Sequence, residues 1–349
     1  MRALTVSPGT KDSGRLDDVP APARNDGGVL LAPLAVGVCG TDAEILAGEY
    51  GWSPPGRDRL ALGHECAARV LASSSGFEQG ELVVPIVRRP DPVPCPACAA
   101  GEWDMCRNGR YTEHGIKELD GFCAEQLQLP ADSLVRVPPS LGLHAVLTEP
   151  TSVVAKAWEH IERIGHRAYW SPKKVLVTGA GPVGLLAALL GRQRGLEVMV
   201  FDRVTDGPKP RLVSELGAQY SNAPIADLLK ASPPDIVLEC TGAAPVLIEV
   251  IQHNAPGCIT CLVGVSSEGH SVPVDLGALN RSIVLDNDVV FGSVNANRRH
   301  YDLAAQALAR ADRAWLDTLI TRRVPLAQWQ SAFTRRADDV KVLLEINAS

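Results

Sequence analysis

The stretch Val175-Leu-Val-Thr178-Gly179-Ala-Gly181-Pro182-Val183-Gly184 decides the fold of this chain. An apolar run predicts a buried strand, three glycines follow with G-x-G-x-x-G spacing, and the next residues predict a helix. In such a turn the first glycine allows a sharp bend. The second lets the backbone approach a pyrophosphate, and the third lets the helix pack closely on the strand. Because the helix N-terminus offers free N–H groups to phosphates, the stretch predicts a dinucleotide-binding site.

Strand and helix patterns alternate on both sides of this turn, from about residue 150 to 290. The expected strands are EVMVFD, DIVLECTG and CITCLVGV, and the helices between them are PKPRLVSELGA and APVLIEVIQHN. Uninterrupted apolar strands that alternate with helices are typical of a parallel sheet covered on both faces. The first 150 residues differ, because short β-like runs are separated there by Gly and Pro. They predict an irregular, mainly β domain.

Composition excludes several classes of protein. The 349 residues carry 34 basic and 40 acidic side chains, a net charge of −6, which argues against a general nucleic-acid binder. No apolar stretch approaches the ~20 residues that cross a bilayer, and the N-terminus shows no secretory pattern. We therefore expect a cytoplasmic protein whose nine cysteines do not form a disulfide framework.

The acidic residue Asp202 bears on the choice of cofactor. It lies 23 positions after Gly179, at the end of the next expected strand, where a carboxylate accepts hydrogen bonds from the ribose hydroxyls of NAD. Arg203, with Lys209 and Arg211 nearby, would instead suit the 2′-phosphate of NADP. NAD is favoured, and use of NADP stays open.

A set of metal-ligating residues precedes the dinucleotide motif. Gly37-Val-Cys39-Gly-Thr41-Asp42 is followed by Gly63-His64-Glu65, and thiolate, imidazole and carboxylate groups suit a catalytic zinc ion. This G-V-C-G-T-D segment with G-H-E about 25 residues later resembles the zinc-dependent medium-chain dehydrogenases. The resemblance covers essentially the whole chain. It implies an α/β protein with a GroES-like, mainly-β catalytic domain over 1–155 and 294–349. A doubly wound Rossmann domain would occupy 156–293.

A narrower resemblance points to one branch of that family. Gly48-Glu-Tyr-Gly51, Arg110-Tyr-Thr-Glu113-His-Gly-Ile116 and Thr148-Glu149-Pro150 resemble the glucose dehydrogenases. The resemblance implies a zinc ion held by Cys39, His64 and Glu149, with Glu65 as a close or exchanging ligand and Asp42 orienting His64. Two assignments stay open. Glu65 is either a ligand or a carboxylate that supports the ligands, and Glu149 is either a ligand or a residue favoured by the dipole at a helix start.

This resemblance implies oxidation of an aldose, D-glucose above all, at C1 to the lactone, with hydride transfer to NAD(P)+. Thr41 would hydrogen-bond the reacting oxygen and pass on its proton. Glu44 would either end that relay or be a solvated helix carboxylate. The implied sugar-binding residues are Thr41, Glu113, Glu149, Arg88 and Asn295, with Arg89 in the same segment as Arg88. The implied cofactor-binding residues are Gly179, Gly181, Pro182, Val183, Gly184, Asp202, Arg203, Thr241 and Asn295.

A second metal site is expected in a cysteine-bearing lobe. Cys95, Cys98 and Cys106 match the last three of four cysteines in the family pattern, but the first falls at Pro92, which cannot ligate. Asp91 is the substitute that would complete a closed zinc site, since such a site needs four donors. The alternative is a lobe that folds without metal.

Two other functions remain to be distinguished from aldose oxidation. One is a polyol- or threonine-type secondary-alcohol dehydrogenase, and the other is a zinc-free, quinone reductase-like protein. We expect a sugar as the small-molecule partner, no nucleic acid or membrane partner, and a homo-oligomer, either dimer or tetramer.

Overall fold

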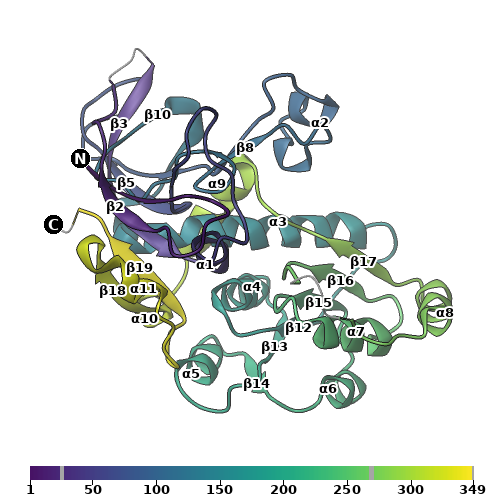
Figure 1. Cartoon of the computed structure of the whole chain (residues 1–349). Helices are drawn as coiled ribbons and strands as arrows, with labels where there is room; N and C mark the ends of the chain where they lie inside the picture. The colour runs from purple at the N-terminus through teal and green to yellow at the C-terminus, as the bar shows by residue number, and fades with distance from the viewer. Residues whose placement is uncertain (24–26, 267–270, 348–349) are drawn as a thin grey trace. The chain divides into compact units, whose positions relative to one another are not determined.

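A computed structural model describes residues 1–23, 27–266 and 271–347 (Figure 1). The chain divides into two compact units. Unit 1 comprises Met1–Ser152, Asn295–Arg310 and Ile320–Ser349. Unit 2 comprises Val153–Val294 and Ala311–Leu319, so the short segment that contains α10 (Arg313–Leu319) is grouped with it. Among the described residues, no helix has the length and apolar character needed to cross a bilayer.

Unit 2 is built on a six-stranded, wholly parallel sheet. Its strand order is β14 (Gln219–Ser221), β13 (Glu197–Phe201), β12 (Lys174–Thr178), β15 (Ile236–Glu239), β16 (Ile259–Leu262) and β17 (Val289–Gly292). The order reverses beside β12, and open parallel sheets bind ligands at the carboxyl ends of the strands at such a point. The glycine turn Gly179–Gly184 follows β12 there. The sheet-bearing half of the expected α/β fold is confirmed.

Helices surround this sheet in Figure 1, as the alternating sequence pattern predicts. They are α4 (Pro182–Gln193), α5 (Pro208–Glu215), α6 (Ile225–Ala231), α7 (Ala244–His253), α8 (Leu276–Asp286) and most of α3 (Thr148–Gly165). Because β12 and β15 lie between other strands and have helices on their faces, their side chains are almost wholly buried. An uninterrupted apolar strand sequence is the result.

Unit 1 is mainly β. Its largest sheet has the order β11 (Leu134–Arg136), β6 (Leu82–Pro85), β5 (Glu65–Val70), β3 (Gly28–Val38), β19 (Lys341–Glu345) and β18 (Ile320–Pro325), and β10 (Leu127–Pro130) also pairs with β3. Two three-stranded sheets are β2 (Arg15–Asp18), β1 (Arg2–Val6), β4 (Leu60–Ala61) and β7 (Arg88–Arg89), β8 (Thr112–His114), β9 (Glu118–Leu119). The helices are α1 (Gly40–Leu46), α2 (Pro96–Ala99), α9 (Arg298–Ala309) and α11 (Trp329–Phe333). This architecture agrees with the irregular β domain predicted from the Gly and Pro punctuation.

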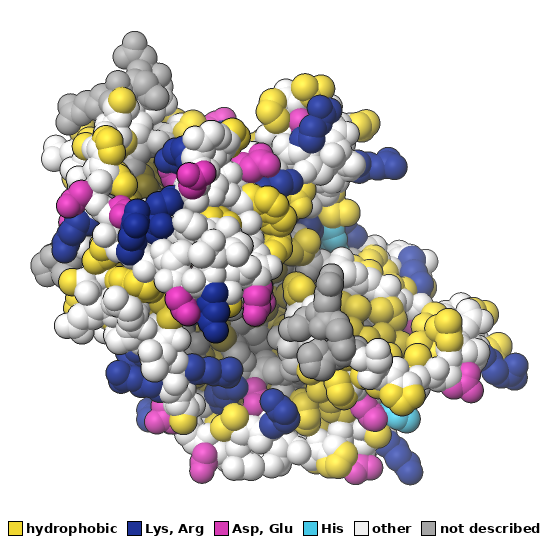
Figure 2. Space-filling view, viewed as in Figure 1, with side chains coloured by type: hydrophobic (Ala, Val, Ile, Leu, Met, Phe, Trp, Pro, Cys, Tyr) yellow, Lys and Arg dark blue, Asp and Glu magenta, His cyan; other side chains and the backbone are white. Residues whose placement is uncertain are grey.

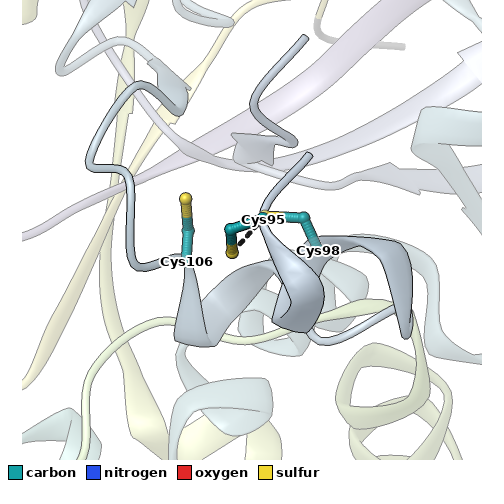
Figure 3. Close-up of side chains that lie close together, drawn as sticks. All are labelled: Cys95, Cys98 and Cys106. Atoms are coloured by element: carbon teal, nitrogen blue, oxygen red, sulfur yellow. Dashed lines mark hydrogen bonds between the residues drawn. The ribbon is translucent and has the colours of Figure 1, made fainter. Parts of the chain in front are cut away.

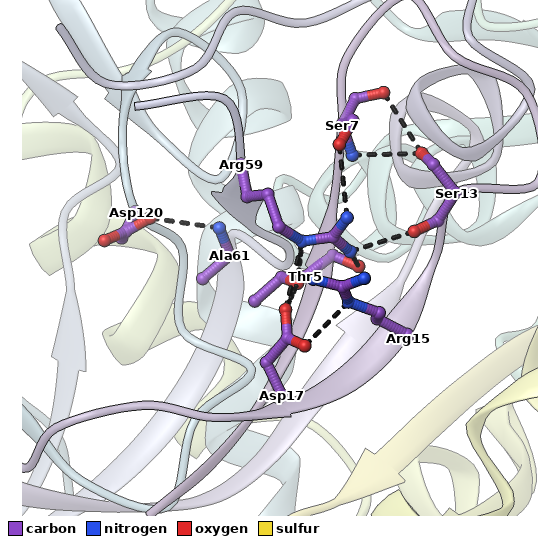
Figure 4. A network of polar contacts seen from close by, with 8 residues as sticks. All are labelled: Thr5, Ser7, Ser13, Arg15, Asp17, Arg59, Ala61 and Asp120. Carbon is purple, nitrogen blue, oxygen red and sulfur yellow. Dashed lines mark hydrogen bonds and ion pairs between the residues drawn. The ribbon is translucent and has the colours of Figure 1, made fainter. Parts of the chain in front are cut away.

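A partly buried network of polar side chains around Arg59 stabilises the N-terminal sheet of unit 1 (Figure 4). The Arg59 guanidinium donates to Thr5 Oγ1 at 2.7 Å, to Ser7 Oγ at 3.1 Å and to the Ser13 carbonyl at 2.9 Å. It also forms an ion pair of 3.0 Å with Asp17. One side chain thus joins β1, β2 and the turn between them, and we assign Arg59 a structural role.

Candidate active site and metal centre

Two metal-ligating side chains predicted from the sequence lie in direct contact. Cys39 Sγ is 3.0 Å from His64 Nε2, and one ligand atom each of Cys39, His64 and Glu65 lie within 4.8 Å of one another. Strand pairing explains this proximity, because β3 and β5 are antiparallel with Gly37 opposite Glu65. Cys39 then caps the N-terminus of α1, which turns the chain away from β3. The donor set fits a zinc ion, which accepts sulfur, nitrogen and oxygen ligands.

Asp42 lies behind the histidine, as expected for a residue that orients it. Its Oδ1 is 3.4 Å from His64 Nδ1, and its Oδ2 accepts from the Cys39 backbone N–H at 3.0 Å. Burial raises the pKa of Asp42, but the charge and hydrogen bond of His64 outweigh burial, so the pKa lies below its ordinary value. Asp42 therefore contacts Nδ1 of the imidazole and leaves Nε2 toward Cys39.

Glu149 occupies the second position of α3 and is half-buried. Burial raises its pKa to about 7, while the charge of His64 lowers it and that of Glu65 raises it. Charges of the candidate metal ligands therefore shift the pKa of Glu149. Among the described residues, however, the cluster that could hold a metal ion comprises Cys39, His64 and Glu65 and does not include Glu149. Its role as a zinc ligand stays a prediction.

Lys341 is a residue of this site that the sequence analysis did not identify. Its ammonium forms an ion pair with Glu65 Oε2 and donates to the Val38 carbonyl at 3.0 Å. Both charged side chains are almost completely buried. The one available signal was a lysine at the start of the apolar run VKVLLEI, where a charge needs a partner.

The two residues of the expected proton relay lie on the first turns of α1. Thr41 is half-buried and Glu44 is exposed. Both follow the candidate metal ligand Cys39 within one and a half turns of helix. Their roles in proton transfer stay predictions.

Three of the predicted sugar-binding residues form one hydrogen-bonded network in unit 1. Arg88 Nε donates to Glu113 Oε1 at 3.0 Å, and Asn295 Nδ2 donates to the same oxygen at 2.6 Å. Arg88 lies opposite Glu113 in the β7–β8 pair, and its guanidinium carbon is 3.6 Å from the centre of the Tyr111 ring. The sequence does not predict this stacking role of Tyr111. By contrast, Arg89 pairs with Asp132 at 2.9 Å. The network holds the Glu113 carboxylate in one orientation.

The three cysteines of the lobe also lie together (Figure 3). Cys95 Sγ and Cys98 Sγ are 3.6 Å apart, and the Arg107 backbone N–H donates to Cys95 Sγ at 3.4 Å. That hydrogen bond is the largest cause of a lowered pKa of Cys95, about 6, whereas burial raises the pKa of Cys98 to about 11. Cys106 completes the group.

The proposed fourth ligand of the lobe, Asp91, is buried beside these thiols but is not part of their cluster. Its Oδ1 accepts from the Val93 backbone N–H at 2.8 Å. Its Oδ2 is buried without a hydrogen-bond partner and lies 3.7 Å from Arg110 Nε. A buried carboxylate oxygen in this position fits a bound cation.

The glycine turn of unit 2 has the local geometry that a dinucleotide requires. Gly179 has a φ of +90°, and a Cβ on Gly184 would lie 1.8 Å from the Gly179 carbonyl oxygen. A Cβ on Gly181 would meet no atom within 4 Å, so the backbone there is open to an approaching phosphate. Pro182 and Val183 form the first turn of α4. Thr241 contacts this turn, because its methyl carbon lies 3.0 Å from the position of a Cβ on Gly179.

Asp202 is already paired with protein groups. Its Oδ2 accepts from the Ala180 backbone N–H at 2.7 Å and from Lys209 Nζ at 2.9 Å, and its Oδ1 accepts from Val204 N–H at 3.1 Å. Burial raises the pKa of Asp202, but these donors hold it below its ordinary value. Arg203 is exposed beside it. The Asp202 carboxylate, which the sequence predicts to bind the cofactor ribose, is thus paired with the Lys209 ammonium.

A parallel-sheet unit with this glycine turn, and a β unit with a thiolate–imidazole–carboxylate group, define a zinc-type medium-chain dehydrogenase. Residues 25–139 match the alcohol dehydrogenase GroES-like domain, and residues 142–346 match the glucose dehydrogenase C-terminus. The chain therefore belongs to the glucose dehydrogenase family. The expected fold class and family are confirmed.

Individual relatives extend over the whole chain. It is 44% identical to glucose 1-dehydrogenase 2 of Vulcanisaeta moutnovskia and 44% identical to glucose 1-dehydrogenase of Thermoproteus tenax, and each alignment covers 99% of both chains. The structure of Haloferax mediterranei glucose dehydrogenase in complex with NADP, Zn and gluconolactone superposes with a TM-score of 0.92. It is 32% identical and covers 100% of both chains.

Proposed function

We propose that this chain is a zinc-dependent glucose 1-dehydrogenase that oxidises an aldose at C1 to the lactone with NAD(P)+. The carrying observation is the contact between Cys39 and His64, with Glu65 beside them, in a chain whose full-length relatives are glucose dehydrogenases. The Haloferax protein holds gluconolactone, the lactone of glucose, together with NADP and Zn. This relative supports D-glucose as the substrate.

When bound, zinc would lower the pKa of the anomeric hydroxyl and the nicotinamide would accept the C1 hydride. The chain binds and orients. Cys39 and His64, with Glu149 or Glu65 as carboxylate ligand, would hold the metal, and Asp42 fixes the His64 ring. Thr41 Oγ1 would accept a hydrogen bond from the reacting hydroxyl and, as that proton moves onto it, release its own hydroxyl proton toward Glu44, which would pass it to solvent.

Glu113 provides the sugar specificity in this proposal. Its Oε1 accepts the hydrogen bonds from Arg88 and Asn295, so its other oxygen is left to accept from a sugar hydroxyl. A site that aligns a buried carboxylate in this way favours a polyhydroxylated substrate over a simple alcohol. A polyol dehydrogenase would share these features, and an assay of aldoses against polyols separates the two.

For the cofactor, we infer that the chain accepts NADP as well as NAD. Asp202 favours NAD, but its charge is paired with Lys209 and would repel a 2′-phosphate less than a free carboxylate. Arg203, exposed beside Asp202, adds a second cation in reach of the same ribose. Gly179, Gly181, Pro182, Val183, Gly184 and Thr241 would receive the rest of the dinucleotide.

We also infer a structural zinc in the lobe, held by Cys95, Cys98, Cys106 and Asp91. The clustered thiols and the buried Asp91 Oδ2, which has the Arg110 guanidinium beside it but accepts no hydrogen bond, support this assignment. Zinc analysis of Asp91→Ala tests it: the variant is expected to lose one of two zinc equivalents and to unfold at lower temperature. Two equivalents in Asp91→Ala would show that Asp91 is no ligand.

Association into a dimer or tetramer is proposed through the edge of the six-stranded sheet. β17 ends the strand order, and no side chain of α8, the helix that precedes it, is fully buried. Figure 2 shows hydrophobic side chains over α8, where Leu276, Val284 and Leu285 are each more than 60% exposed. Apolar surface of this kind favours association.

The free state of all nine cysteines supports a cytoplasmic location.

The decisive experiment is an assay of aldoses and polyols with NAD and with NADP, before and after removal of the metal. Glucose oxidation that disappears with the metal and returns with zinc is the expected result. Oxidation of sorbitol or L-threonine without activity on aldoses would favour a secondary-alcohol dehydrogenase. Undiminished activity without zinc would exclude the proposed mechanism and favour a quinone reductase-like protein.

A further inference from the structure

The ion pair between Lys341 and Glu65 connects the metal site to β19. Lys341 has 1% and Glu65 has 3% of its surface exposed, so water does not screen either charge. The ammonium also donates to the carbonyl of Val38, the residue before the metal ligand Cys39. One side chain therefore contacts two of the segments that would provide metal ligands.

The space for this ion pair exists only because residue 37 is glycine. A Cβ on Gly37 would lie 2.1 Å from Glu65 Oε2 and 2.8 Å from Lys341 Cε. Gly37 lies opposite Glu65 in the β3–β5 pair and opposite Leu343 in the β19–β3 pair. The two charged side chains thus meet above the backbone of the central strand, at the position where a side chain is missing.

A metal ion bound at this site would compete with Lys341 for the Glu65 carboxylate. One of its oxygens lies within 4.8 Å of ligand atoms of Cys39 and His64, so a metal ion there is in reach. Its Oε2 is bound to Lys341. A buried carboxylate is stable as an anion only beside a cation. Because Lys341 already provides that cation, Glu65 does not have to bind the metal.

We propose that Lys341 is a positioning residue that holds Glu65 in an ion pair and so keeps it from becoming a permanent ligand of the catalytic metal. This inference rests on the proposed zinc-dependent function, which requires one open coordination position for the sugar hydroxyl. When Lys341 is replaced by an uncharged residue, the metal is the remaining cation for Glu65. Glu65 then occupies the open position.

The test replaces zinc by Co2+, whose absorption spectrum reports the number and kind of its ligands. The variants are Lys341→Met, Lys341→Arg and the double variant Lys341→Met with Glu65→Gln. We expect a changed cobalt spectrum, metal release to a chelator slowed about 10-fold and a kcat lowered about 10-fold in Lys341→Met. Lys341→Arg keeps the wild-type spectrum, since its guanidinium pairs with carboxylates. The double variant regains it, because glutamine is a poor substitute for a charged ligand.

Several outcomes would overturn the inference. An unchanged cobalt spectrum in folded Lys341→Met would show that Lys341 does not control Glu65, and faster metal release would show that it stabilises the metal site instead. A changed spectrum that persists in the double variant would exclude Glu65 as the cause. Failure of the proposed function would give a different result. Wild-type protein and Cys39→Ser would then bind the same amount of Co2+.

Discussion

Cys39 Sγ and His64 Nε2 lie 3.0 Å apart although 25 positions separate the two residues in the chain. The β3–β5 pairing and the start of α1 bring them together. The contact therefore depends on the register of two strands and on the turn from β3 into α1.

Removal of either ligand is expected to abolish metal binding at this site. Cys39→Ser and His64→Gln should each lose one zinc equivalent and reduce kcat by more than about 100-fold. Substitution of residues that only support metal ligands typically lowers activity about 10- to 100-fold, and loss of a ligand itself should exceed this. Elemental analysis and initial rates with glucose measure both effects. Cys258→Ala, which removes a buried thiol of unit 2, serves as the control and should keep its zinc content.

Substitution of Glu113 should affect the sugar and not the cofactor. Loss of a buried hydrogen bond costs about 1–3 kcal/mol, so Glu113→Ala should raise the KM for glucose roughly 10- to 100-fold. The KM for NAD should stay nearly constant. Because Arg88 loses its carboxylate partner, thermal unfolding is measured in parallel. Equal increases in both Michaelis constants would assign Glu113 a structural role.

Lys209 should decide between the two cofactors. Lys209→Met removes the cation paired with Asp202, so the bare carboxylate should lower kcat/KM for NADP by about 10-fold or more and leave that for NAD within a factor of about 3. Competition by 2′,5′-ADP, followed by NADPH fluorescence, measures the same effect without turnover. Arg211→Met is the matched control, since Arg211 pairs with Glu215. A parallel loss for both cofactors would contradict the prediction.

The stability of unit 1 should fall with acidification because of His114. Burial is the main cause that lowers the pKa of this histidine from 6.5 to about 4, and Nδ1 contacts the Asp120 carbonyl at 2.7 Å. The unfolded chain therefore binds a proton near pH 6.5, whereas the folded chain does so only near pH 4. The neutral form stabilises the fold above pH 6.5 and loses this contribution, roughly 3 kcal/mol, between pH 6.5 and 4.

Denaturant unfolding at a series of pH values measures this dependence. His114→Gln should unfold with a shallower dependence on pH between 6.5 and 4 than the parent protein. His253→Gln, at an exposed histidine of α7, should retain the parent slope. Identical slopes for all three proteins would show that His114 does not account for the effect.

The features that could be predicted from the sequence are the local ones. The glycine turn needs only Gly179, Gly181 and Gly184 in order, and alternation of strands and helices identifies the parallel sheet. Cys39 and His64 were found because the residues around each form a recognisable segment. The structure adds their contact, which depends on strand register.

The features that could not be predicted depend on partners distant in the sequence. Lys341 and the Val38 carbonyl are 303 positions apart, and only the β19–β3 pairing joins them. Lys209 was recognised as a nearby base, but its ion pair with Asp202 requires the conformation of the loop between β13 and α5. Side-chain charge alone does not reveal which groups neutralise each other.

The place of Lys341 in β19 also has a consequence during synthesis of the protein on the ribosome. The segments that carry Cys39, His64 and Glu65 emerge long before Lys341, whose ammonium contacts two of them in the finished sheet. Until β19 adds to β3, Glu65 has no lysine beside it, and an ion that enters early meets a different set of donors. The full set of groups around Glu65 therefore exists only once the C-terminal strand has joined the sheet.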